Sequence, residues 1–168
     1  MYFPIIFFLL LSPLLAQEAD SLINFTLEDQ FDRVHQRSDY EGKITILFGS
    51  DRDGSQYNDD WAEPIADSLK VFNLYDKVEF IGLADLGNVP YLMRSFVRSM
   101  MPKEDNQHPI LLDWDGLFSE SYNFVEAHSN LIIFDHNFNK ISQKALREVK
   151  PDTLSDIVEI ILSQLKND

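Results

Sequence analysis

The fold is decided by the stretch Lys-Ile-Thr-Ile-Leu-Phe-Gly-Ser (residues 43–50), Asp-Arg-Asp-Gly-Ser-Gln-Tyr-Asn-Asp-Asp (51–60) and Trp-Ala-Glu-Pro-Ile-Ala-Asp-Ser-Leu (61–69). The run from Ile44 to Phe48 is apolar and rich in β-branched residues, which is typical of a central strand buried on both faces. An acidic loop follows it, and then an amphipathic helix. In an open α/β sheet the loop after such a strand lies at the carboxyl end of the sheet, where functional sites usually form.

The helix after the loop is predicted from its apolar spacing. Trp61, Ile65, Leu69 and Phe72 are four, four and three residues apart, so they share one helical face that we expect to be buried. Pro64 lies inside this pattern and removes one hydrogen-bond donor, so it predicts a kink or a restart of the helix.

Strand and helix patterns alternate along the rest of the chain. The second helix is predicted to start near Asn88 and Pro90 and to bury a stripe of Leu92, Phe96 and Met100. Arg94 and Arg98 lie on another face, which we expect to be solvated. The alternative is that these two arginines bind an anion or an acidic partner. The other predicted elements are a hairpin (23–27 with 33–35), strands (77–84, 110–112, 131–134), a short helix (117–124), a return strand (140–146) and a last helix capped by Asp152 or Thr153.

This order predicts an α/β fold with a mainly parallel sheet, helices on both faces and an antiparallel edge. We see no linker that would divide the chain, so residues 17–168 are expected to form a single domain.

Composition excludes several kinds of function. The 28 acidic and 14 basic side chains give a formal charge of -14, which repels nucleic acid and anionic lipid and permits cations and basic protein surfaces. The chain has no cysteine, so it cannot form a disulfide, a thiolate nucleophile, a zinc–thiolate site or an iron–sulfur cluster.

The first sixteen residues, Met1 to Ala16, carry no charged side chain and contain an apolar run from Ile5 to Leu11. They are shorter than the ~20 residues that span a bilayer. We therefore expect residues 1–16 to be a signal peptide cleaved near Ala16, although it has no Lys or Arg before the apolar run. The mature protein would then be exported, either periplasmic or secreted, and would have no membrane span.

Several short motifs, in this order and spacing, resemble the redoxin and peroxiredoxin-like (AhpC/TSA-type) domains of the thioredoxin fold. They are Phe-Thr-Leu-Glu-Asp-Gln (25–30), Gly-Lys (42–43), Pro64 in the helix after the site loop, Leu-Leu-Asp-Trp-Asp-Gly (111–116) and Phe-Asp (134–135). Phe-Val-Arg-Ser (96–99), together with Asp135, is also similar to the YtfJ-like periplasmic proteins. The resemblance implies a thioredoxin-like three-layer sandwich: a central mixed sheet with helices on both faces and an N-terminal hairpin.

The departures from this family decide what the resemblance implies about function. Its Cys-x-x-Cys motif would fall on Asp-Gly-Ser-Gln (53–56), and the proline that the family places in cis before a late strand would fall near Ser129. Neither feature is present in this sequence. The resemblance therefore implies the fold and no catalytic residue.

Two clusters of acidic residues are candidates for metal binding or acid–base chemistry. The acidic loop 51–63 supplies Asp51, Asp53, Asp59 and Asp60, whose oxygens suit calcium, although the spacing is not that of an EF-hand. The alternative is a solvated loop that caps the following helix. Asp113 and Asp115 form a second acidic turn, for which a purely structural role is the alternative. The four histidines are scattered and suggest no shared site.

We therefore expect an exported, non-catalytic thioredoxin-like domain that binds a protein partner and needs no cofactor. The first alternative is a calcium-binding module or metal-dependent enzyme that uses the acidic loop. The second is a degenerate redoxin-family oxidoreductase that acts with a partner carrying the thiols.

Overall fold

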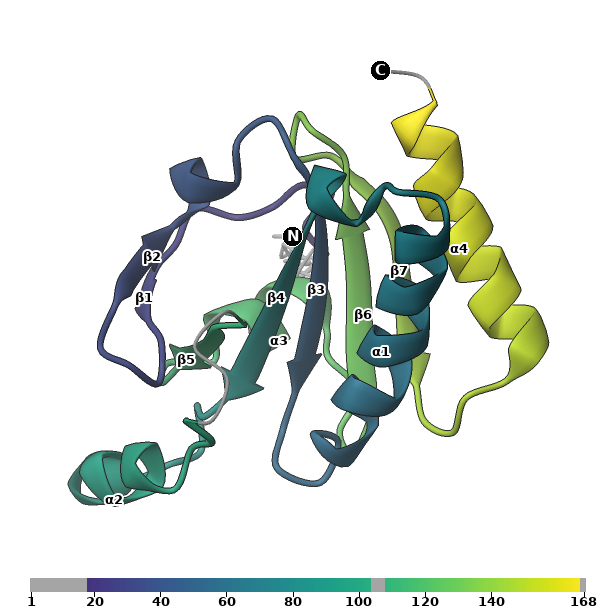
Figure 1. Ribbon diagram of the computed structural model, residues 1–168. Coiled ribbons are helices and arrows are strands. Elements are labelled where there is room, and N and C mark those ends of the chain that lie inside the picture. The colour runs from purple at the N-terminus through teal and green to yellow at the C-terminus, as the bar shows by residue number, and fades with distance from the viewer. Residues whose placement is uncertain (1–17, 104–107, 167–168) are drawn as a thin grey trace, which may run out of the picture.

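The computed structural model describes residues 18–103 and 108–166, which are built around a five-stranded sheet in the order β5-β4-β3-β6-β7 (Figure 1). Three of its strands run parallel: β3 (Ile44–Ser50), β4 (Val78–Asp85) and β5 (Ile110–Asp113). The last two strands are antiparallel: β6 (Ser129–Phe134) pairs with β3, and β7 (Lys140–Leu146) pairs with β6. The predicted signal peptide, residues 1–16, lies outside the described residues.

A two-stranded hairpin and four helices complete the fold. The hairpin consists of β1 (Thr26–Glu28) and β2 (Val34–Gln36). The helices are α1 (Gln56–Val71), α2 (Arg94–Ser99), α3 (Leu117–Tyr122) and α4 (Pro151–Leu165), and short 3-10 turns cover Arg37–Tyr40, Tyr75–Lys77 and Tyr91–Met93. In the described part of the chain no helix is long and apolar enough to cross a membrane.

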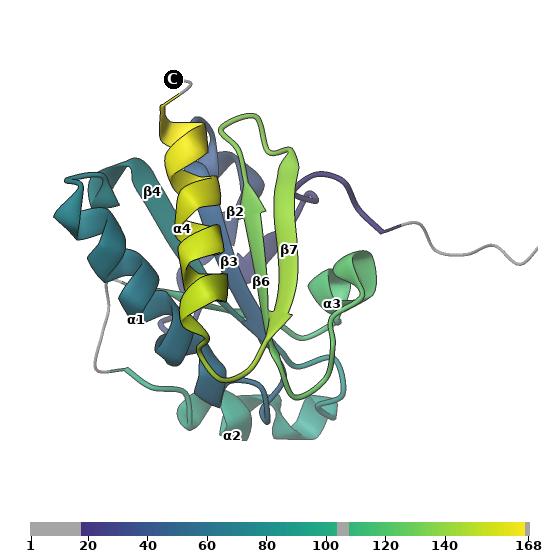
Figure 2. The same ribbon diagram turned by 90° about the vertical axis from the view of Figure 1, so that its right-hand side faces the viewer.

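Both faces of the sheet are covered, as the alternation of strands and helices predicts. Successive residues of a strand point to opposite faces, so Ile46 packs with α1 and α4, whereas Leu47 packs with α3 and the N-terminal segment. Figure 2 shows α1 and α4 beside each other on one side of the sheet and α3 on the other. All seven residues of β3 are buried, which confirms the prediction of a central strand.

The first helix differs from the prediction in three respects. It begins at Gln56 rather than near Trp61, so Asp59 and Asp60 lie in its first turns and not in the acidic loop, and it continues to Val71 without a restart at Pro64. Trp61, Ile65 and Leu69 are buried as predicted, but the expectation for Phe72 is wrong: this ring is 54% exposed, because the helix ends one residue earlier.

The prediction for the second helix is wrong in its orientation. Leu92, Phe96 and Met100 are 91%, 57% and 69% exposed, so they form no buried stripe. The side that was expected to be solvated, with Arg94 and Arg98, instead faces the domain, because both guanidinium groups hydrogen-bond to other elements.

The last helix begins earlier than the capping signals predict. It starts at Pro151, with Lys150 as the residue before it, so neither Asp152 nor Thr153 is the cap. Proline suits this position because its missing N–H has no partner in the first turn of a helix. Three apolar side chains at the centre of the helix, Ile157, Val158 and Ile161, are buried.

Candidate functional site

The loop after β3 is held in shape by Asp51. Its Oδ1 accepts a hydrogen bond from the Gly54 backbone N–H (2.7 Å), and its Oδ2 accepts one from the Ala127 N–H (2.9 Å). The carboxylate therefore joins two loops that lie 76 residues apart in the chain. Both of its oxygens stabilise backbone, which accounts for this acidic residue without a metal ion.

Gly54 lies at the point where the same two loops meet. A Cβ atom built on it would lie 2.2 Å from the carbonyl oxygen of His128, closer than two non-bonded atoms can approach. Only glycine fits there unless the backbone moves. Gly54 is the second of the four residues that replace the Cys-x-x-Cys motif, so this part of the loop is packed against the chain before β6.

The other residues of this four-residue stretch bond to nearby backbone. Ser55 Oγ donates to the Arg52 carbonyl (2.8 Å), and Gln56 Nε2 donates to the Asp53 carbonyl (2.8 Å). Each of these side chains thus hydrogen-bonds to the carbonyl three residues earlier, and both bonds shape the turn that leads into α1. The Asp53 side chain is exposed. The stretch keeps a defined conformation and contains no thiol.

The hydroxyl of Ser50, at the end of β3, is paired with an amide group. Its hydroxyl is buried and accepts a hydrogen bond from the Asn58 amide Nδ2 (2.9 Å). An amide nitrogen cannot take a proton from a serine hydroxyl, so this contact does not activate Ser50 as a nucleophile.

The four residues predicted to bind metal do not act together in the structure. Asp51 bonds to backbone, Asp53 is on the exposed part of the loop, and Asp59 and Asp60 are exposed on the first turns of α1. Among residues 18–103 and 108–166, no group of three or more His, Cys, Asp or Glu side chains is placed to hold a metal ion. A calcium site in this loop stays a prediction.

The second acidic turn splits into two different environments. Asp113 is fully buried, and its carboxylate accepts hydrogen bonds from the Leu117 (3.0 Å) and Phe118 (2.8 Å) N–H groups at the start of α3. Burial raises the pKa of Asp113 despite these bonds, and the charge of Asp85 raises it further. Asp115 is exposed and lies 3.4 Å from Arg94 Nη2. The buried carboxylate has the structural role that was the alternative for this turn.

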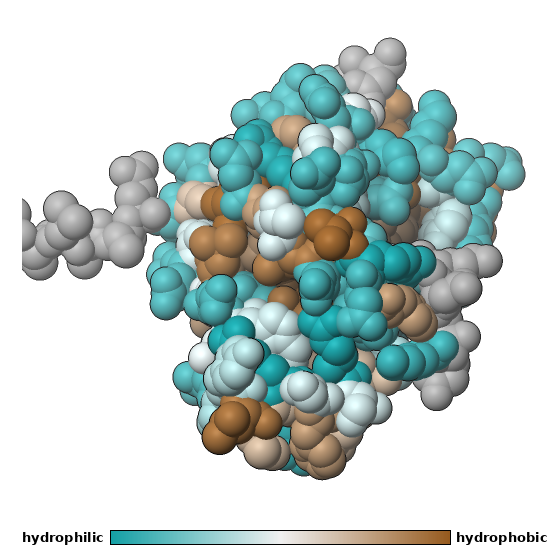
Figure 3. Space-filling view, turned by 90° about the vertical axis from the view of Figure 1, so that its left-hand side faces the viewer, coloured by the Kyte–Doolittle hydropathy of each residue, from teal (hydrophilic) through white to brown (hydrophobic). Residues whose placement is uncertain are grey.

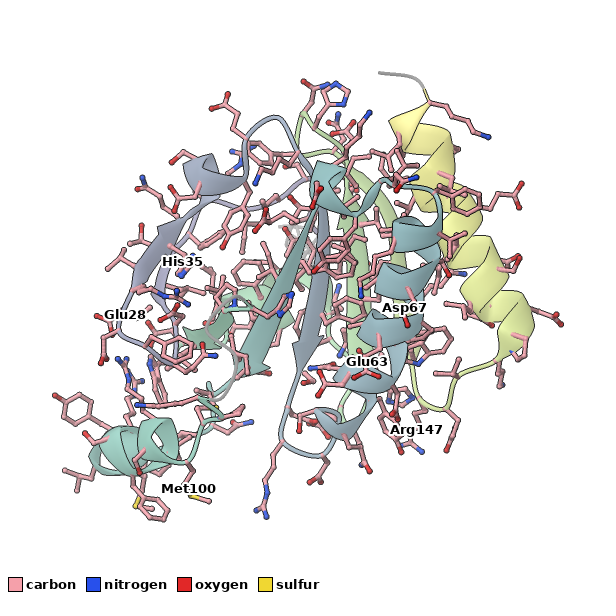
Figure 4. All side chains as sticks on the ribbon, viewed as in Figure 1. Glu28, His35, Glu63, Asp67, Met100 and Arg147 are labelled. Carbon is pink, nitrogen blue, oxygen red and sulfur yellow. The ribbon has the colours of Figure 1, made fainter. Side chains whose placement is uncertain are left out.

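Sequence reasoning missed a buried ionic cluster in the N-terminal hairpin. Asp29 is fully buried, and its Oδ2 lies 2.6 Å from Arg33 Nε and 3.0 Å from His35 Nε2. The other ring nitrogen of His35 lies 3.1 Å from the hydroxyl of Tyr40, and Figure 4 shows His35 on the hairpin. Only the i, i+4 spacing of Asp29 and Arg33 was visible in the sequence; Tyr40 joins through the fold of the chain after β2.

This cluster perturbs the titration of two of its members. Burial acts to raise the pKa of Asp29, but hydrogen bonds from Arg33, His35 and the Phe31 N–H outweigh it, so the pKa falls below its usual 3.8. Burial, with the nearby charges of Glu79, Asp39 and Asp29, raises the pKa of Tyr40. The ionised Asp29 thereby stabilises the hairpin, and the residues after it reach the main sheet: Gln30 Oε1 accepts a hydrogen bond from the Ile110 N–H (2.7 Å).

Searches with known protein families and with curated proteins found no match to this chain. Solved structures do match it. The exposed lipoprotein thioredoxin of Streptococcus pneumoniae is 16% identical with a TM-score of 0.59, covering 82% of this chain and 98% of that one. The mitochondrial 2-Cys peroxiredoxin of Plasmodium falciparum is 17% identical with a TM-score of 0.56, covering 90% and 98%.

A SCO1/SenC family lipoprotein of Bacillus anthracis is also similar, at 12% identity and a TM-score of 0.54, covering 86% of this chain and 95% of that one. At these identities the likeness shows the fold alone. The chain has the thioredoxin-like fold that its motifs predict, and it has no cysteine.

Proposed function

We propose that this chain is an exported thioredoxin-like domain that binds a protein partner and carries out no thiol chemistry of its own. One observation carries the proposal: the loop at the carboxyl end of β3 keeps a tightly built conformation around Asp51 and Gly54, yet has Asp-Gly-Ser-Gln (53–56) where the related fold has its thiols. Fold alone is no warrant for an activity, so the residues at the site outweigh the likeness to oxidoreductases.

The same end of the sheet supplies groups suited to binding. Asp53, Asp59 and Asp60 are exposed, and none of them forms an ion pair with a described residue. Carboxylates of this kind favour a basic partner and hasten its association. They are also the groups that the alternative, a calcium-binding module, would use.

Export is supported by the apolar start of the sequence and by the matched lipoproteins of Streptococcus pneumoniae and Bacillus anthracis. Mass spectrometry of the protein recovered from outside the cytoplasm tests this part. We expect a mature chain that begins near Gln17, and a retained Met1 would contradict the cleavage.

The non-catalytic part is tested by disulfide-reduction and peroxide-consumption assays on the full chain. We expect rates equal to those without protein, because the chain lacks a thiolate. A variant with Asp53→Cys and Gln56→Cys is the matched control, since it restores two thiols on the same scaffold. Turnover by the unmodified chain alone would overturn the proposal, whereas turnover only with an added thiol protein would favour the degenerate oxidoreductase.

A further inference from the structure

The segment between β4 and β5 has its polar and apolar sides reversed relative to an ordinary surface helix. It comprises the 3-10 turn Tyr91–Met93 and α2 (Arg94–Ser99), followed by two methionines. Its side chains Tyr91, Leu92, Met93, Phe96 and Met100 are 45–91% exposed. We call these five residues the apolar tip.

Specific contacts of the arginines hold the segment in this orientation. Arg98 Nη2 lies 2.6 Å from Glu28 of the hairpin, and Arg98 also pairs with Asp32. These ion pairs join the arginine side of α2 to a distant part of the chain.

Arg94 provides a second attachment. Its Nη2 donates to the Trp114 carbonyl (3.0 Å), and its guanidinium lies 5.5 Å from the centre of the Trp114 ring. With two anchors on one face of α2, the opposite face is presented to solvent as a fixed surface.

The apolar tip forms a group of side chains rather than a set of isolated residues. Figure 3 shows apolar side chains gathered at the lower end of the face where α2 lies, and Figure 4 shows Met100 at the outer edge of the molecule. Three of the four methionines of the chain are in this segment, at positions 93, 100 and 101. Clustered exposed apolar residues mark interaction sites, and methionine is common on surfaces that adapt to a partner.

Charge determines which partner fits. From Leu86 to Lys103 the chain has no acidic residue, and Arg94 and Arg98 are already neutralised by carboxylates of the domain. Figures 1 and 2 place α2, the loop after β3 and the start of α1 at the same end of the molecule. The exposed Asp53 belongs to that loop, and the exposed Asp59 and Asp60 belong to the first turns of α1.

We propose that the apolar tip and these three carboxylates together dock an amphipathic basic polypeptide segment of a partner protein. The apolar side of the segment packs on Leu92, Phe96 and Met100, and its Lys or Arg side chains face the acidic loop. A second copy of the chain would bring carboxylates against carboxylates, and an anionic membrane would meet a molecule of charge -14. The inference rests on the proposed function as a binding module and names the chemistry of its partner.

The test is a binding titration of the full chain with a labelled, helix-forming peptide of leucine and lysine, with its leucines on one face. We expect saturable binding that weakens with salt, and that weakens by about 30-fold in the Leu92→Ser, Phe96→Ser variant, as for anchors at the centre of an interface. The variant should fold, because both side chains are exposed. Val71→Ser is the matched control: Val71 is 77% exposed but lies at the far end of α1, and we expect no change.

Four results would each overturn the inference: no binding; equal binding of the same peptide with glutamate in place of lysine; self-association abolished by the double variant; or binding to phosphatidylglycerol vesicles that depends on the tip. Weakening by Asp53→Asn with Asp59→Asn supports it. The redox assays are independent of this titration, so thiol-free turnover would overturn the proposed function, whereas failure of the peptide to bind would overturn this inference alone.

Discussion

Removing the Asp29 carboxylate tests whether the buried cluster holds the hairpin on the domain. The carboxylate accepts hydrogen bonds from the Phe31 N–H (2.8 Å), the Arg33 N–H (3.0 Å), Arg33 Nε (2.6 Å) and His35 Nε2 (3.0 Å). Asp29→Ala leaves these donors without their acceptor. Removing one partner of a buried ion pair costs about 3–5 kcal/mol. Because the Arg33 side chain is 46% exposed and water can replace part of its contact, we expect about 3 kcal/mol.

The milder variant Asp29→Asn keeps one oxygen acceptor and the shape of the side chain. We expect it to lose roughly half as much, about 1.5 kcal/mol, since each hydrogen bond to a charged group contributes on the order of 1.5–3 kcal/mol and solvent compensates in part. For a domain of this size each kcal/mol lowers the melting temperature by about 2–4 °C. The two variants should therefore melt about 9 °C and 4 °C below the parent chain.

The dependence on pH gives the sharper measurement. The pKa of Asp29 in the folded protein lies below its usual 3.8, so the carboxylate stabilises the fold above that pH and loses this contribution as the pH falls through the folded value. Asn does not titrate, so the difference in unfolding free energy between parent and Asp29→Asn should be full at neutral pH and shrink below about pH 4.

Denaturant unfolding at several pH values measures this difference. Asp20→Asn is the control, because that side chain is exposed, and we expect a change within about 0.5 kcal/mol. A loss below about 1 kcal/mol for Asp29→Ala, or a difference for Asp29→Asn that is the same at acidic and neutral pH, would refute the reasoning.

Three further predictions concern the site loop, the α2 anchor and the metal alternative. Gly54→Ala should destabilise the fold by about 1–3 kcal/mol in denaturant unfolding, because its Cβ would overlap the His128 carbonyl; an unchanged midpoint would show that the two loops separate freely. Arg98→Ala should speed limited proteolysis within residues 91–99 several-fold while lowering the free energy of unfolding by only about 1 kcal/mol, with Lys70→Ala, from an exposed i, i+3 pair, as the control without effect. If the loop binds calcium, calcium at ~100 times its Kd should add about 2.7 kcal/mol to the free energy of unfolding and raise the melting temperature by several degrees. A shift that Asp53→Ala abolishes would establish the metal alternative. The binding-module proposal expects the same melting temperature with calcium and with chelator.

Local pattern was sufficient wherever an element packs on the sheet through its apolar side chains. The run at 44–48 and the four-residue spacing of Trp61, Ile65 and Leu69 predicted β3 and α1, because burial of apolar surface is the main force that holds these elements in place. The same rule was wrong for α2. Its apolar stripe is as regular as that of α1, yet the stripe is exposed, and Arg98 on the other side of the helix pairs with carboxylates 66 and 70 residues away.

The sequence by itself determined the α/β fold and excluded thiol chemistry. The periodicity of strands and helices is a local feature, and the absence of cysteine is a feature of composition, so neither depends on tertiary contacts. Only the tertiary structure decided what the polar residues do. Asp51 bonds to Ala127, Asp29 joins His35 and indirectly Tyr40, and Arg98 reaches the hairpin. These contacts depend on how the elements pack against one another. The local sequence around a charged group or a hydrogen-bond donor does not identify a partner that is distant in the chain.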